Sequence, residues 1–137
     1  MEEVKSLENN ALLTFQQQVS DLLLRHRSVL DVSSKFQESN SRVNRALVKA
    51  VTECGCIEIQ GSRQPFEKEM PLDDMQFTAK SHLTGNLCDH CQDIVRAEMG
   101  KNLFYLTAMC NLLDIKLDEV VEQESNKLST LGVFNLR

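Results

Sequence analysis

Apolar side chains recur every three or four positions along the first part of the chain. One such stripe lies within residues 12–36, at Leu12, Phe15, Val19, Leu22, Leu23, Val29, Leu30, Val32 and Phe36. A second stripe follows within residues 43–54, and this spacing is that of one face of an α-helix. Because no Gly or Pro interrupts residues 11–54, we expect one long helix or a kinked pair that ends near Gly55. The polar residues 37–42 could be a short connection or the exposed side of that helix.

The second half of the chain predicts a loop and three further helices. Residues 58–71 contain Gly61, Pro65 and Pro71 and predict a loop. Residues 72–83 predict a short helix before a break at residues 84–86, and Pro71 suits its first turn. The strongest helical stripe covers residues 88–113, and a last helix is expected over about 117–128 after a break near Asp114. We expect no strand, and therefore an all-α bundle of four to five helices that forms one domain over residues 1–137.

Composition and charge exclude several classes of protein. The chain has 5 Gly, 2 Pro and 42% hydrophobic residues, which disfavours an all-β fold and can supply one hydrophobic core. Its net charge of −5 does not indicate a nucleic-acid-binding surface. The polar, acidic start of the chain is unlike a secretory signal, and no apolar run approaches the roughly 18–20 residues of a membrane span. We therefore expect a soluble, cytoplasmic protein.

Four cysteines form two close pairs. Cys54 and Cys56 lie in "TECGCI" at the expected end of a helix, and Cys88 and Cys91 lie in "LCDHCQ" at the expected start of another. In a reducing compartment such pairs favour metal binding over a disulfide framework. Zinc takes four thiolates in a tetrahedron, and each pair could supply two of them. We predict a structural zinc site on these four residues.

Two alternatives stay open for the cysteine pairs. The Cys-Asp-His-Cys motif could be a reversible redox pair, although the expected helices do not resemble the βαβ context of a thioredoxin-like domain. The cysteines could also be ordinary, partly buried thiols. His82 or His90 could replace one thiol as a ligand. The fifth cysteine, Cys110, falls on the apolar stripe and is interpreted as a core residue.

Residues 97–128, "AEMGKNLFYLTAMCNLLDIKLDEVVEQESNKL", resemble the second half of MazG-like nucleoside triphosphate pyrophosphohydrolases. Members of that all-α family carry an apolar "LFYLxAL" helix followed by "GIxLxEVxxxxxxKL". The family also has an upstream metal helix of the form Glu-Glu-x-Gly-Glu-Leu, on which "TECGCI" can be placed with Gly55 at the family glycine. The resemblance covers about 32 residues well and the first helices loosely. It implies a MazG-like bundle that assembles as a homo-oligomer, such as a dimer, and for which a nucleotide is a candidate ligand.

The family's ExxE…ExxD motif holds Mg²⁺ against a triphosphate. Carried over to this chain, its four positions become Glu53, Cys56, Glu98 and Lys101. A thiol is a poor Mg²⁺ ligand, and a lysine places a positive charge where the cation would bind. The resemblance therefore implies the family's fold without its usual Mg²⁺ site.

Three functions follow from these observations. We expect a zinc-stabilised, MazG-like binding or regulatory module rather than an enzyme. The first alternative is a nucleotide pyrophosphohydrolase with a rearranged Mg²⁺ site, in which Glu53 and Glu98 are the candidate catalytic residues, together with Glu58 or Asp93. The second alternative is a zinc or redox sensor in which the cysteine pairs release metal on oxidation.

Overall fold

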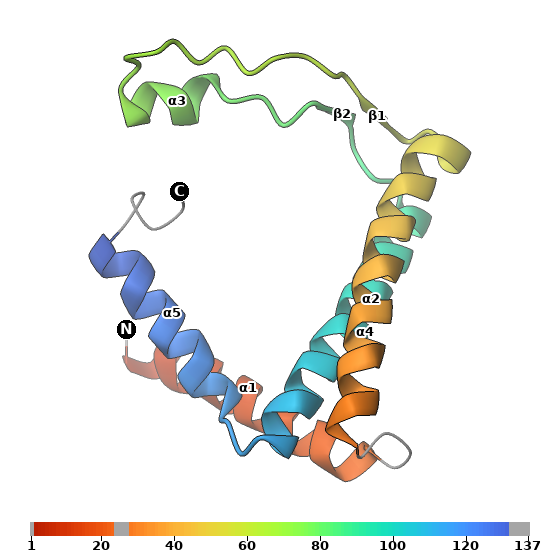
Figure 1. Cartoon of the computed structure of the whole chain (residues 1–137), viewed down its shortest axis with the longest axis vertical. Helices are drawn as coiled ribbons and strands as arrows, with labels where there is room; N and C mark the ends of the chain where they lie inside the picture. Colours follow the sequence, from red (N-terminus) through yellow and green to blue (C-terminus); the bar gives the residue numbers. More distant parts are fainter. Residues whose placement is uncertain (1, 24–27, 132–137) are drawn as a thin grey trace. The chain divides into compact units, whose positions relative to one another are not determined.

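The computed structural model describes residues 2–23 and 28–131, and the side chains from residue 11 onward. Five α-helices lie in these ranges: α1 (Glu2–Leu22), α2 (Val29–Lys49), α3 (Leu72–Thr78), α4 (Asp89–Leu112) and α5 (Leu117–Leu131) (Figure 1). A π-helical turn, η1 (Ala50–Cys54), follows α2, and two short strands are β1 (Ile57–Ile59) and β2 (Leu83–Gly85). The structure is mostly helical, as the sequence predicts. None of its described helices has the length and apolar character needed to cross a membrane.

The chain divides into two compact units. Unit 1 comprises the residues up to Ser41 and those from Met99 onward, and unit 2 comprises Arg42–Glu98. The boundary falls inside α2 and α4, so each unit contains a segment of both helices. The expectation of one domain over residues 1–137 stays a prediction.

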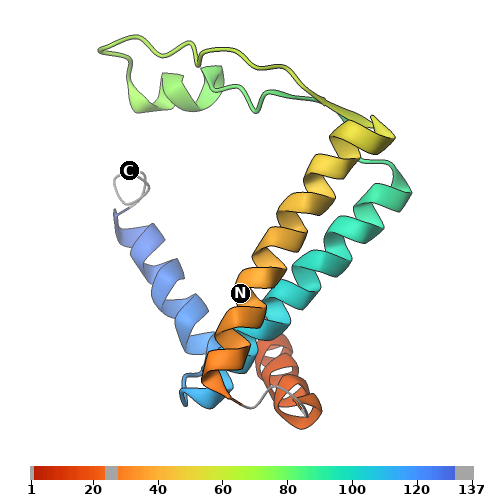
Figure 2. The ribbon, with the colours of Figure 1, turned by 45° about the vertical axis from the view of Figure 1, so that its right-hand side comes forward.

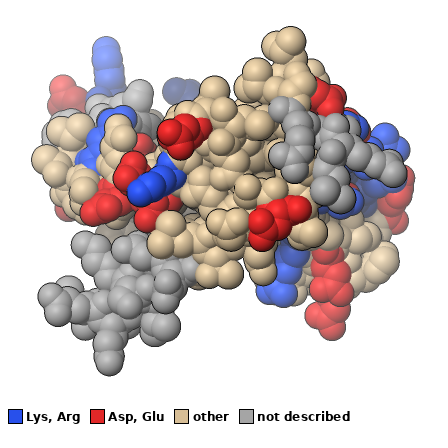
Figure 3. Space-filling view, turned by 90° about the horizontal axis from the view of Figure 1, so that it is seen from below, with Lys and Arg blue, Asp and Glu red and all other residues tan. Residues whose placement is uncertain are grey.

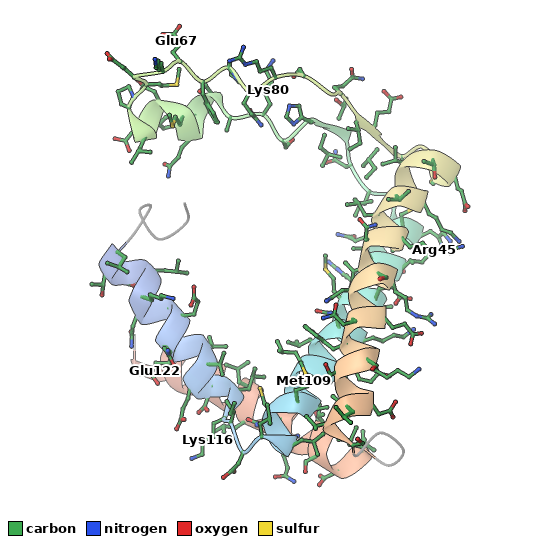
Figure 4. The ribbon with its side chains drawn as sticks, in the orientation of Figure 1. Arg45, Glu67, Lys80, Met109, Lys116 and Glu122 are labelled. Atoms are coloured by element: carbon green, nitrogen blue, oxygen red, sulfur yellow. The ribbon has the colours of Figure 1, made fainter. Side chains whose placement is uncertain are left out.

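Unit 1 is built around a small apolar core. Its buried members are Val19, Leu23, Val32 and Ala108, with Phe15, Phe104 and Met109 packed against them. In this unit the segments of α2 and α4 run side by side in opposite directions, as the two views in Figure 1 and Figure 2 show. The Met109 side chain is marked on α4 in Figure 4. The stripe of apolar positions over residues 12–36 thus supplies much of a core, as its helical spacing predicts.

Hydrogen bonds of Gln16 link α1 to α4 and to the start of α5. Its Nε2 donates to the carbonyl oxygen of Ile115 at 2.8 Å, and its Oε1 accepts the backbone N–H of Leu117 at 2.9 Å. Asn111 Nδ2 of α4 donates to the carbonyl oxygen of Gln16 at 3.1 Å. A helix start leaves its first backbone N–H groups without helical partners, and the Gln16 amide provides a partner for α5.

Unit 2 has a second core and a long excursion of the chain. Its buried residues are Ala50, Ile57 and Cys91, which come from η1, β1 and α4. β1 and β2 pair antiparallel, with Ile57 opposite Gly85 and Ile59 opposite Leu83. Beyond them the Gln60 N–H donates to the carbonyl oxygen of His82 at 2.8 Å. The strands therefore hold both ends of the intervening segment together.

The arm, which we define as residues 60–82, contains α3 and continues from this strand pair. Gln64 forms two hydrogen bonds with the backbone of Lys80, donating to its carbonyl oxygen at 2.7 Å and accepting from its N–H at 2.8 Å. Figure 4 marks Lys80 and Glu67 on the two limbs of the arm. Phe77 on α3 is 90% exposed. The arm is thus held by backbone and amide hydrogen bonds rather than by a core of its own.

Several expectations from the sequence are wrong in detail. The expected loop at 58–71 begins inside β1, and the expected break at 84–86 overlaps β2, so the expectation of no strand is incorrect. The helix expected over residues 72–83 ends at Thr78. Of the two interpretations of residues 37–42, the helical one is confirmed, since they lie inside α2. The N-terminal helical region instead comprises two helices, of which α1 ends at Leu22 and α2 begins at Val29.

Candidate metal centre

The structure brings all four paired cysteines together in unit 2. The Sγ atoms of Cys54, Cys56, Cys88 and Cys91 all lie within 4.8 Å of one another. Four thiolates placed about 2.3 Å from a central zinc would lie roughly 3.8 Å apart at the corners of a tetrahedron. The Sγ atoms of Cys54 and Cys88 are 3.8 Å apart. The donor set and its spacing therefore fit a tetrahedral thiophilic ion with small adjustments.

The turn that ends η1 positions the first pair, Cys54 and Cys56. The N–H of Gly55 donates to the carbonyl oxygen of Ala50 at 2.9 Å, which is the wider bond of a π-turn. Gly55 has a φ of 77°, a left-handed conformation that glycine adopts without strain. This reversal brings Cys56 back beside η1, where its Sγ lies 3.9 Å from the carbonyl oxygen of Ala50. Cys54 and Cys56 can thus face the same point although only one residue separates them.

The second pair is placed by the start of α4. The backbone N–H of Cys91 donates to Sγ of Cys88 at 3.4 Å, and the N–H of Gln92 donates to the carbonyl oxygen of Cys88 at 2.8 Å. An N–H donor aimed at a sulfur stabilises the thiolate form that binds a metal. Cys91 is buried against Ala50 and Ile57, whereas Cys88 is half-buried. The beginning of the helix therefore orients this pair and stabilises the thiolate of Cys88.

Gly85 supports the cysteines from β2. A Cβ atom at this position would lie 2.7 Å from the carbonyl oxygen of Cys56, closer than such atoms approach in folded proteins. Gly85 also has a φ of 90°, which side-chain-bearing residues rarely adopt. The strand pair can therefore close against the first cysteine pair only with glycine here. The sequence placed this glycine in a simple break and did not predict its role.

The thiols differ in their affinity for protons when no metal is bound. Hydrogen bonding to Cys91 lowers the pKa of Cys88 to about 7; the larger effect comes from the Cys91 backbone N–H and the smaller from the Cys91 side chain. The pKa of Cys91 is raised to about 12, chiefly by its hydrogen bond with the Cys88 side chain and secondly by burial. A cluster of thiols in which one sulfur is a thiolate near neutral pH is prepared for a cation, because each further thiolate would repel the first. Burial also raises the pKa of Cys110, which lies in unit 1 and is buried as the sequence predicts.

A cavity of about 390 Å³ adjoins the cysteines in unit 2. Cys54 and Cys91 line it together with the polar side chains of Lys49, Glu53 and His90. His90 is exposed. His82 is oriented by a different contact, since its Nε2 lies 2.6 Å from the carbonyl oxygen of Ser62 in the arm. The cavity is a feature that no spacing in the sequence indicated, because Lys49 and His90 come from different helices.

The carboxylates considered for a Mg²⁺ site do not gather into one group as the four cysteines do. Glu53 is exposed on η1, and Glu98 is half-buried on α4. Glu58 and Asp93 are exposed. Among the side chains of residues 11–23 and 28–131, the group of metal-binding side chains that comes together is that of the four cysteines, and it includes none of these carboxylates.

The basic side chains of unit 2 include Arg42, Arg45 and Lys49 on one helix, and all three are exposed. Figure 4 shows Arg45 on α2. On the face drawn in Figure 3, the described acidic and basic side chains are interspersed rather than gathered by sign. Among the described residues on this face (Figure 3), the basic side chains therefore form no separate patch.

No protein-family model matches the chain, and no curated protein or solved structure is significantly similar to it.

Proposed function

We propose that the protein is a zinc-stabilised helical module that binds a partner or regulates one, with Cys54, Cys56, Cys88 and Cys91 as the four ligands. The observation that carries this proposal is the meeting of four sulfur atoms within 4.8 Å of one another. Thiolates favour zinc over Mg²⁺, and a site with four protein ligands leaves no position for a substrate or an activated water. The zinc is therefore structural rather than catalytic.

The position of the site in the fold explains what the metal would stabilise. The four ligands join the end of η1 to the start of α4, and Cys54 and Cys88 are 34 positions apart in the sequence. The core beside them contains few fully buried side chains, of which Ile57 is the largest. A small core of this kind gains much of its folding free energy from a bound metal. Unit 2 should consequently depend on zinc for its stability.

We further propose that the fold belongs to the MazG-like architecture. The helical turn between α4 and α5 supports this resemblance, because Asp114 has a φ of 56° at the position where the family pattern has glycine. The exclusion of Glu53 and Glu98 from the cysteine group supports a MazG-like protein without the usual Mg²⁺ site. Assembly as a homo-oligomer, binding of a nucleotide and a cytoplasmic location remain predictions.

The deciding experiment is the metal content of protein purified without added metal. We expect about one zinc per chain, measured by atomic emission, and loss of most of it in Cys88→Ser. Cys110→Ser is the matched control, because Cys110 is a buried cysteine of unit 1 and should leave the zinc content unchanged. Iron in place of zinc would correct the identity of the metal. Wild-type protein without any bound metal would overturn the proposal.

A Mg²⁺-dependent hydrolysis assay separates this function from the enzyme alternative. Zinc-loaded protein should release no pyrophosphate from a panel of nucleoside triphosphates. Activity that disappears in Glu53→Gln and Glu98→Gln would overturn the assignment as a non-catalytic module and restore the pyrophosphohydrolase.

A further inference from the structure

The four cysteines are unequal in their access to solvent. Cys54 is exposed, Cys56 and Cys88 are half-buried, and Cys91 is 7% exposed. Cys56 is also directed toward the carbonyl oxygen of Ala50, and Cys88 accepts a hydrogen bond from the backbone of Cys91. Cys54 is therefore the most accessible of the four residues to a reagent that arrives from solvent.

The cavity beside the cysteines gives this sulfur room for a reagent. Its volume of about 390 Å³ far exceeds the roughly 10–15 Å³ that one water needs. A peroxide is little larger than a water. The polar groups of Lys49, Glu53 and His90 line the same cavity and can hydrogen-bond a peroxide beside Cys54. Cys91 also lines the cavity but is buried, whereas Cys88 and Cys56 are not among the lining residues.

Cys88 is positioned to react with Cys54 once Cys54 is oxidised. Sγ of Cys88 lies 3.8 Å from Sγ of Cys54, although the two residues come from different helical segments. A sulfenic acid condenses with a thiolate that can reach it. The distance must shorten to about 2.05 Å, so the two side chains need to move by less than 2 Å in total.

We propose that Cys54 is the oxidation site of this metal centre and that Cys88 resolves it, so that a small peroxide releases the zinc and leaves a Cys54–Cys88 disulfide. This inference rests on the proposed function, because it requires bound zinc. In the first step the Cys54 thiolate attacks one peroxide oxygen and the O–O bond breaks. The sulfenic acid forms, and the leaving hydroxide takes a proton from solvent to become water.

In the second step the Cys88 thiolate attacks the Cys54 sulfur and the S–O bond breaks. The sulfenic oxygen leaves as hydroxide and takes a proton to become a second water. Overall, two thiolates, one hydrogen peroxide and two protons give one disulfide and two waters. The two sulfurs lose two electrons and the peroxide gains them. Zinc then retains only the thiolates of Cys56 and Cys91, which are too few to hold it in a tetrahedral site.

The tryptic fragments of this chain make the disulfide simple to assign. Cys54 and Cys56 fall in one fragment, residues 50–63, and Cys88 and Cys91 fall in another, residues 81–96. Zinc-loaded full-length protein is first assayed for metal content and then treated with hydrogen peroxide. Zinc release is followed with a chromogenic chelator, remaining thiols are alkylated, and the digest is examined by mass spectrometry. We expect fragments 50–63 and 81–96 to be joined, with fragmentation placing the link between Cys54 and Cys88.

Two variants accompany the wild type. In Cys54→Ser that retains zinc, release by peroxide should be at least tenfold slower, whereas Cys110→Ser should release zinc at the wild-type rate. Where Cys54→Ser does not retain zinc, the disulfide in the wild type decides the matter alone. A first disulfide within fragment 81–96, between Cys88 and Cys91, would overturn the inference while leaving the zinc site intact, as would zinc that peroxide does not release. Protein that contains no metal before treatment would overturn the proposed function itself, and this inference with it.

Discussion

Gly85 and Cys56 approach each other so closely that a Cβ on the glycine would lie 2.7 Å from the cysteine's carbonyl oxygen. The contact joins β2 to the turn that carries the first cysteine pair. A methyl group at this position must push two pieces of backbone apart, because neither partner is a flexible side chain.

Gly85→Ala should therefore lower the stability of unit 2 and weaken zinc binding at the proposed four-cysteine site. The added strain of a side chain at a φ of 90° and the clash together should cost about 2–4 kcal/mol of unfolding free energy. Urea unfolding and zinc retention against a chelator measure the two effects. Gly61→Ala is the control, because a Cβ at Gly61 would meet nothing within 4 Å. Equal stability of the two variants would contradict the role given to Gly85.

The side-chain amide of Gln16 should contribute more to the unfolding free energy than that of the neighbouring Gln17. Gln16→Ala removes the partner of the Leu117 N–H and of the Ile115 carbonyl oxygen, and should lower the unfolding free energy by about 1–3 kcal/mol. The control is Gln17→Ala, since Gln17 is exposed and bonds only to Asp21 on its own helix among the contacts described. That variant should change stability by no more than about 0.5 kcal/mol. Similar losses in both variants would show that the amide does not hold α5.

Asp114 should be improved by glycine. It follows α4 with a φ of 56°, and the next N–H, that of Ile115, donates to the carbonyl oxygen of Cys110 at 2.8 Å. This is the usual closure of a helix by a left-handed residue. Asp114→Gly should raise the unfolding free energy, measured by thermal unfolding, by about 0.5–1 kcal/mol. This figure already allows for the greater conformational freedom that glycine gives the unfolded chain. Asp114→Ala, which keeps a Cβ and loses the polar group, should be less stable than wild type. A glycine variant less stable than wild type would argue against this account.

In reduced, metal-free protein the thiolate fraction rather than exposure should set the order of alkylation, so Cys88 should react with iodoacetamide before the more exposed Cys54. The pKa of Cys88 is lowered to about 7, so its thiolate fraction, and with it the alkylation rate, rises as the pH increases through about 7. Cys91, with its pKa raised to about 12, should react slowly up to pH 9. Mass spectrometry of alkylated fragments 50–63 and 81–96 over pH 6–9 tests the order. Added zinc should slow the reaction at Cys88, and a faster reaction at Cys91 would reverse our assignment of the thiolate.

The sequence predicts the helices and the grouping of the two cysteine pairs far better than it predicts the strands. Helical spacing repeats over many residues, and the two cysteine pairs stand out by their close spacing in the sequence. By contrast, Ile57–Ile59 and Leu83–Gly85 are each three residues long and gain their stability from pairing with each other. No local sequence pattern indicates this pairing, because 23 residues lie between Ile59 and Leu83.

The cavity and the unequal exposure of the thiols could not have been predicted from residue order. Cys54 and Cys56 are separated by one residue, yet the left-handed turn at Gly55 leaves one exposed and the other half-buried. Likewise, Lys49 and His90 share a cavity only because two distant segments pack together in unit 2. Gln16 gave no signal either, since a glutamine on a helix surface is common and its bonds reach residues 99 and 101 positions away.

The two ends of the arm lie side by side, because the Gln60 N–H donates to the His82 carbonyl oxygen. The length of the arm should therefore not affect the positions of the four sulfur atoms. The entropy of closing such a loop grows only with the logarithm of its length, so doubling it would cost about 0.6 kcal/mol. Insertions in the arm should therefore be tolerated far better than a single methyl group at Gly85. The same chain thus combines a segment open to evolutionary change with a junction that admits almost none.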